Sequence, residues 1–146
     1  MVYFLKVLNQ QELKTIEYFF QLKQPQLMKA MARYLESNYS NVIITDGFVL
    51  AVGDIPVAIT AHLDTVFKQP PQNIFYDRVK NVLWSPQGLG ADDRAGVFAI
   101  LKIIKMGLRP HVIFTTDEEL GGVGASILAY DYKKPFADMK YIPIPH

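Results

Sequence analysis

The sequence GLGADDRAG at residues 88–96 joins a glycine-rich turn to two adjacent carboxylates, Asp92 and Asp93. Apolar side chains recur at helical spacing after it, which predicts a helix over residues 92–106 with one wide apolar face. Gly90 ends the turn, so Asp92 is predicted to lie at the start of this helix. Acidic side chains at a helix start are often simple caps, so the motif needs support from elsewhere in the chain.

Two further acidic clusters flank this turn in the sequence, and each follows a predicted strand. Residues 54–64, DIPVAITAHLD, and residues 111–117, HVIFTTD, show the β-branched and small apolar pattern of strands that are buried on both faces. Ligands collect beyond the carboxyl ends of the strands in open α/β sheets. Polar side chains of the three clusters are therefore predicted to converge on one rim of the sheet. They are His62, Asp64, Asp92, Glu118 and Glu119.

These residue types suit a metal-dependent hydrolase. Strand alternation places His62 and Asp64 on one face, so Asp64 can accept the second ring N–H and leave the other nitrogen for a metal. Of Glu118 and Glu119, one can bind metal while the other stays free as a general base. Asp92 can bridge two ions through its two oxygens. Each cluster alone is more often a surface pair or a solvated helix start, but their order and placement together indicate two-metal hydrolysis.

The motifs AHLDTV, GLGADDRAG and FTTDEELGGVGA, in this order, resemble the N-terminal signatures of the co-catalytic di-zinc exopeptidases. That superfamily includes tripeptidase T, glutamate carboxypeptidases, aminoacylases and the tetrahedral aminopeptidases. The matched region spans residues 55–125. The resemblance implies a three-layer α/β/α fold with a central mixed, mostly parallel sheet. It also implies a cis peptide bond between Asp92 and Asp93, and an Arg94 side chain that leads away from the metals.

The resemblance also implies a role for each residue of the rim. His62 would bind one zinc ion and Asp64 would orient its ring. Asp92 would bridge both zinc ions, and Glu119 would bind the second. Glu118 would be the general base for a metal-bound water that hydrolyses a peptide bond.

The chain departs from the family pattern near its end. Relatives supply two more ligands, an Asp after the next strand and a His near the C-terminus of a longer chain. The candidate strand here is residues 138–144, DMKYIPI, and it is followed by His146. His146 is either a substitute ligand or a disordered terminal residue. Residues 1–146 are thus expected to form a single truncated catalytic domain that lacks the lid or dimerisation domain.

Three functions remain open from the sequence. The first is a zinc-dependent exopeptidase of the aminopeptidase or di/tripeptidase type, which acts on peptides. The second keeps the site but hydrolyses N-acyl amino acids or related small amides. The third is a catalytically incompetent remnant that acts at most as a binding module. Apolar surface at the truncated face favours a homo-oligomer or a partner chain.

Composition excludes several other classes. A length of 146 residues fits one domain. The net charge of +1 provides no field to attract nucleic acid or an anionic membrane. The absence of cysteine excludes disulfides and thiol chemistry. No apolar run approaches 18 residues, and the N-terminus lacks a secretory signal, so the expected location is cytoplasmic.

Local signals predict the remaining elements. Asn9 and Glu12 form a capping-box pattern at a helix start, and Pro25 marks the first turn of a second helix. Both helices are expected to cover the sheet. An Asp-Gly turn predicts a hairpin over residues 41–52, and a second hairpin is predicted over residues 73–84.

Overall fold

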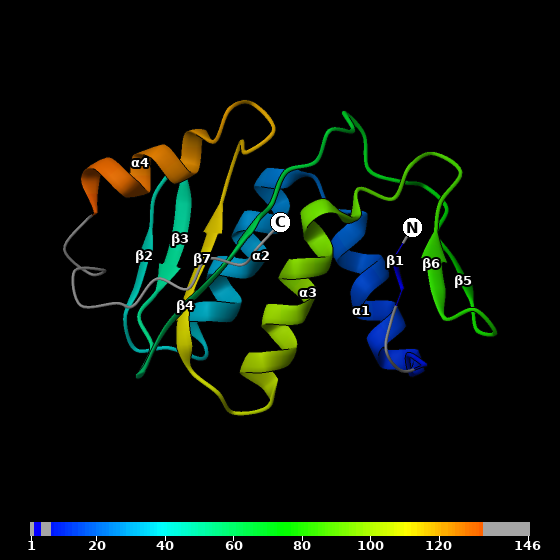
Figure 1. Cartoon of the computed structure of the whole chain (residues 1–146), viewed down its shortest axis with the longest axis horizontal. Helices are drawn as coiled ribbons and strands as arrows, with labels where there is room; N and C mark the ends of the chain where they lie inside the picture. The colour runs from blue at the N-terminus through cyan, green and yellow to red at the C-terminus, as the bar shows by residue number, and fades with distance from the viewer. Residues whose placement is uncertain (1, 4–6, 133–146) are drawn as a thin grey trace.

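A computed structural model of the chain describes residues 2–3 and 7–132 of the 146 residues. At its centre is a four-stranded sheet with the order β2-β3-β7-β4 (Figure 1). The strands are β2 (Val42–Ile44), β3 (Phe48–Ala51), β7 (Pro110–Thr115) and β4 (Ile55–His62). Both β2 and β7 pair with β3 antiparallel, whereas β4 and β7 are parallel.

The predicted α/β fold with a mixed sheet is confirmed: β2, β7 and β4 run in the same direction, and β3 runs against them. The sheet is mixed because β3 lies between β2 and β7. A tight turn at Asp46 and Gly47 folds β2 back onto β3, and the hydroxyl of Thr45 accepts from the Phe48 amide at 3.1 Å. Because β3 also runs opposite to β7, two of the three pairings are antiparallel.

Helices lie on both faces of the sheet, since alternate side chains of each strand point to opposite faces. Val49 and Ala51 of β3 belong to the core under α2 (Gln24–Glu36) and α3 (Ala91–Lys105). Phe48 and Leu50 face the other way and join a smaller cluster with α4 (Val123–Asp131). Both clusters include residues of β7, so burial on both faces explains why this strand is a continuous apolar run.

The first helix, α1 (Gln10–Phe20), begins with the predicted capping box. The Glu12 amide donates to Asn9 Oδ1 at 2.9 Å, and the Asn9 amide donates to Glu12 Oε2 at 3.0 Å. The prediction that this helix covers the main sheet is wrong. Its buried Ile16 and Phe20 pack instead on Leu83 and Leu89.

A second sheet explains the position of α1. This sheet has the order β1-β6-β5, with β1 (Val2–Tyr3), β6 (Val82–Trp84) and β5 (Phe75–Asp77). Strands β5 and β6 form the predicted hairpin over residues 73–84. Leu83 is fully buried in the cluster with Ile16 and Phe20, so this small sheet has an apolar face of its own that α1 covers (Figure 1). No helix among the described residues is long and apolar enough to cross a membrane.

Gly124 is predicted to tolerate no side chain. A Cβ at this position would lie 2.1 Å from Gly47 O and 2.7 Å from Thr116 N, and both contacts are backbone atoms that cannot rotate away. Gly124→Ala is therefore expected to lower the free energy of unfolding by about 3 kcal/mol, the upper end of the usual range for overpacking. Urea denaturation measures this change. Ser126→Ala, an exposed position in the same helix, is the control and should change stability by less than about 0.5 kcal/mol. Equal stability of the two variants would contradict the prediction.

Candidate metal site

The predicted convergence on one rim is present in the structure. Strands β4 and β7 are parallel neighbours with His62 paired to Thr115, so both strands end at the same level. The acidic loop between β7 and α4 (residues 116–122) and the start of α3 meet at this end. His62, Asp92 and Glu119 each offer one ligand atom, and these atoms all lie within 4.8 Å of one another. Three segments that are distant in sequence thus supply one cluster of groups that could hold a metal ion.

The ring of His62 is fixed on both sides. Its Nδ1 lies 3.2 Å from Asp64 Oδ1, and its Nε2 lies 3.2 Å from Asp92 Oδ1. Glu118 Oε2 lies 4.0 Å from the same Nε2. The His62 side chain is 12% exposed, whereas the Asp92 side chain is 89% exposed. The Nε2 edge of a mostly buried ring therefore faces carboxylates that are open to solvent.

Asp64 holds two parts of the site. The carboxylate is buried. One oxygen faces His62, as the sequence predicted, and the other accepts a hydrogen bond from the Glu119 amide at 2.9 Å. The second bond was not predicted. Because one rigid carboxylate contacts both partners, Asp64 fixes the imidazole and the acidic loop relative to each other.

The electrostatics of the site favour a cation. Burial on its own lowers the pKa of His62, but the carboxylates of Asp64, Asp93, Asp92 and Glu118 outweigh it, so the pKa lies above its ordinary value. Burial raises the pKa of Asp93, although the His62 ring and the amides of His62 and Gly96 partly oppose this. Negative charge is thus concentrated around the imidazole. Such a field also stabilises a bound metal ion.

The two adjacent aspartates point in different directions. The peptide bond between them is cis, as the resemblance implies. Their backbone angles are not helical (φ −85°, ψ 112° at Asp92 and φ −108°, ψ 29° at Asp93), so the regular helix begins after Asp93. Asp93 Oδ1 accepts from the Gly96 amide at 3.2 Å. Asp93 thus caps α3, while Asp92 faces His62 and is available as a ligand.

Arg94 leads away from the rim, as predicted. Its Nη1 donates to Phe19 O at 3.0 Å and to Phe20 O at 2.8 Å, which ties the start of α3 to the end of α1. Burial lowers the pKa of Arg94, and the charge of Asp64 opposes this.

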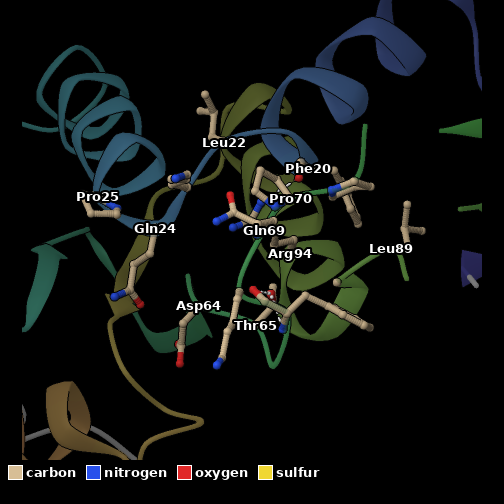
Figure 2. Close-up of a pocket in the computed structure, with 15 residues that line it drawn as sticks. Phe20, Leu22, Gln24, Pro25, Asp64, Thr65, Gln69, Pro70, Leu89 and Arg94 are labelled. Carbon is tan, nitrogen blue, oxygen red and sulfur yellow. Dashed lines mark hydrogen bonds between the residues drawn. The ribbon is translucent and has the colours of Figure 1, made fainter. Parts of the chain in front are cut away.

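Arg94 and Asp64 both line a cavity of about 250 Å³. Figure 2 shows Gln24, Asp64 and Arg94 at its wall, and residues 68–71 also line it.

Gln24 contacts the acidic loop, and the sequence gave no indication of this contact. Its Nε2 donates to Asp117 Oδ1 at 2.8 Å, and its Oε1 accepts from the Asp117 amide at 3.1 Å. A glutamine in the first turn of a helix is an ordinary surface residue in sequence terms, and its partner is 93 positions away. No local pattern could have identified this contact.

Of the other two histidines, the structure describes only His111, and it lies outside this cluster. His111 is at the other end of the sheet, where its Nδ1 accepts from the Gly53 amide at 3.3 Å. His146 and the candidate strand at residues 138–144 lie outside the described residues, so the prediction of a substitute ligand stays a prediction.

The sequence matches no protein-family model and no curated protein, but the fold is similar to solved structures. Aminopeptidase PepT from Bacillus cereus superposes with a TM-score of 0.66 at 20% identity, over 82% of this chain and 40% of that one. A tripeptidase from Staphylococcus aureus gives 0.68 at 19% identity, over 88% and 41%. Human carnosine dipeptidase 1 gives 0.60 at 17% identity, over 90% and 37%.

This chain has the fold of these peptidases. The fold implied by the three sequence motifs is thereby confirmed, within the part that the structures share. The chain spans about two fifths of the length of each of them. Identities of 17–20% establish similarity of fold and leave activity to be argued from the site.

Proposed function

We propose that the rim cluster is the zinc site of an exopeptidase domain of the aminopeptidase or di/tripeptidase type. The observation that carries this proposal is the approach of His62, Asp92 and Glu119 to within 4.8 Å. A peptidase fold alone would not support it, because one fold hosts many activities. The fold and the cluster are independent observations, and both favour metal-dependent hydrolysis of peptides.

The chemistry of the cluster fits zinc. One imidazole nitrogen and two carboxylate oxygens are common ligands of catalytic zinc, which leaves a position open for water or substrate. Asp64 on Nδ1 of His62 is the partner that such a ligand usually has. We propose that His62 would hold one ion, Glu119 would hold a second, and Asp92 would contribute its carboxylate to both. A single ion shared by the three residues is the simpler arrangement, and stoichiometry distinguishes the two.

Glu118 is the proposed general base. A zinc ion, when bound, supplies Lewis acidity that makes water more acidic and polarises a peptide carbonyl. Glu118 Oε2 lies 4.0 Å from His62 Nε2, and its side chain is 52% exposed. It is therefore close to the cluster without belonging to it. Its carboxylate would take the proton from the attacking water and pass it to the leaving amine.

Zinc titration of the chelator-treated chain tests the proposal. Zinc is expected to bind with a stoichiometry of up to two and to stabilise the fold. At a free concentration of 100 times its dissociation constant, it should raise the free energy of unfolding by about 2.7 kcal/mol. Magnesium, which prefers six oxygen ligands in octahedral geometry, is the control. Calorimetry gives the stoichiometry, and absence of zinc binding at millimolar concentration would contradict the proposal.

Substrate assays separate the remaining alternatives. All three similar structures are peptidases by name, which favours peptides over N-acyl amino acids. Release of amino acids from dipeptides and tripeptides, with N-acetyl amino acids tested in parallel, decides between them. Zinc binding without hydrolysis of either class would support a binding role, or a need for further ligands from a second chain. From the peptidase fold and the rim cluster together, we also propose that residues 1–146 form one catalytic domain.

A further inference from the structure

Two side chains hold the acidic loop on the side that faces the rim. Asp64 accepts from the Glu119 amide at 2.9 Å, and Gln24 forms a reciprocal pair with Asp117 at 2.8 and 3.1 Å. Between these two anchor points lies Glu118. Both anchors come from outside the loop: Gln24 is in the first turn of α2, and Asp64 lies two residues after the end of β4. They also line the same cavity (Figure 2).

Thr116, directly before Asp117, donates its amide and its hydroxyl to Gly47 O at 2.9 and 3.1 Å, and backbone hydrogen bonds close the turn that follows. Gly121 and Gly122 donate to Glu118 O at 2.9 Å, and Val123 donates to Asp117 O at 3.1 Å. These bonds close a turn that leads into α4 but do not orient it toward His62. The backbone of Asp117 has φ +53°, a conformation that is uncommon for a residue with a side chain. The two hydrogen bonds from Gln24 stabilise Asp117 in this conformation.

We propose that Gln24 is a positioning residue that sets Glu118 and Glu119 relative to His62. An amide suits this role because it offers a donor and an acceptor at once. Its NH₂ group meets the Asp117 carboxylate, and its carbonyl oxygen meets the Asp117 N–H. An effect of Gln24 on zinc affinity rests on the proposed function, whereas its effect on the position of the acidic loop is independent of that function.

A cycle of isosteric variants tests the pair. Gln24→Glu keeps the acceptor, removes the donor and places a second carboxylate against Asp117. Asp117→Asn keeps the pair, because its amide oxygen still accepts from Gln24 and asparagine tolerates positive φ. The double variant restores a donor and an acceptor in swapped positions. Gln24→Glu alone is therefore expected to disturb the loop, and the other two variants are expected to stay close to wild type.

Amide hydrogen exchange is a readout that requires no metal. In Gln24→Glu, the amides of Asp117 and Glu119 are expected to exchange roughly 10-fold faster, as for the loss of one charge-assisted hydrogen bond. In the double variant, both rates should return to within about three-fold of wild type. Gln21→Ala, which removes a hydrogen bond to Gln72 O at 3.2 Å, is the control and should leave both amides unchanged.

If only the Asp117 amide responds, Gln24 secures its own partner and does not position Glu119, which overturns the proposal. If Glu119 also responds and the double variant does not recover, the effect is not due to the pair, which overturns it as well. Zinc affinity is then measured, with a loss of about 10-fold expected in Gln24→Glu alone. A wild-type chain that binds no zinc contradicts the proposed function, while the exchange data still decide the role of Gln24.

Discussion

His62→Ala is expected to reduce zinc affinity by roughly 100- to 1,000-fold. Structural zinc sites bind with about 10–16 kcal/mol, shared among about four ligands, so the loss of one ligand removes about 2.5–4 kcal/mol. His62 is also the only nitrogen ligand in the described cluster. The remaining carboxylates of Asp92 and Glu119 are both exposed, and exposed carboxylates alone hold zinc weakly. The measurement is calorimetry on chelator-treated protein.

The structure provides a matched control for this variant. His111→Ala removes the other described imidazole, which lies at the opposite end of the sheet on the Gly53 amide. That variant is expected to bind zinc as wild type does. The fold of His62→Ala should persist, because the bond from the Glu119 amide to Asp64 does not involve the ring. A loss of less than about 10-fold would place the zinc ion at other residues and contradict the proposed site.

The location of the site could be predicted because the relevant signals are local. The run from Ile55 to His62 indicates a strand from its composition, although β4 is at the edge of the described sheet and is largely exposed, not buried on both faces as predicted. A strand that ends in His-x-Asp places both side chains on one face. The same reasoning applies to the segment before Glu118. Only one general rule was then needed, that ligands gather where strands end. The positions of His62, Asp64 and Asp92 follow from these steps.

The direction of the strands could not be predicted in the same way. Sequence indicates that residues 48–51 form an apolar strand, but not which strand lies beside it. The structure inserts β3 between β2 and β7 and runs it against both, so two of the three strand pairings are antiparallel. The place of α1 has a similar cause. Its apolar stripe was evident, but the small sheet that it covers is formed by residues about 60 positions further along the chain, too far for a periodic pattern to indicate.

Support for the site was the least predictable part. Gln24 and Asp117 are both polar residues at element ends, and neither type nor spacing links them. The second bond of Asp64, to the Glu119 amide, depends on how the loop after β7 folds back toward β4. Such contacts arise from tertiary packing. Sequence therefore identifies the groups that carry the chemistry better than the groups that hold them in place.

Glu118→Gln is expected to lower the rate of peptide hydrolysis by roughly 100- to 10,000-fold, the usual contribution of a general base. The substitution is isosteric and removes only the ability to take a proton. Zinc affinity is expected to stay unchanged, because Glu118 is not one of the three clustered ligands. Hydrolysis of a tripeptide and calorimetric titration of the same sample measure the two effects.

Glu119→Gln is the matched control, since it changes the adjacent residue in the same way. It should lower zinc affinity, because Glu119 belongs to the cluster with His62 and Asp92. The pair of variants thus separates two roles that the sequence could assign only by resemblance. If Glu118→Gln loses zinc and Glu119→Gln keeps it, the roles are reversed. The structure groups Glu119, and not Glu118, with His62 and Asp92. The zinc titrations of the two variants therefore test which glutamate is the ligand, even in a chain without measurable hydrolysis.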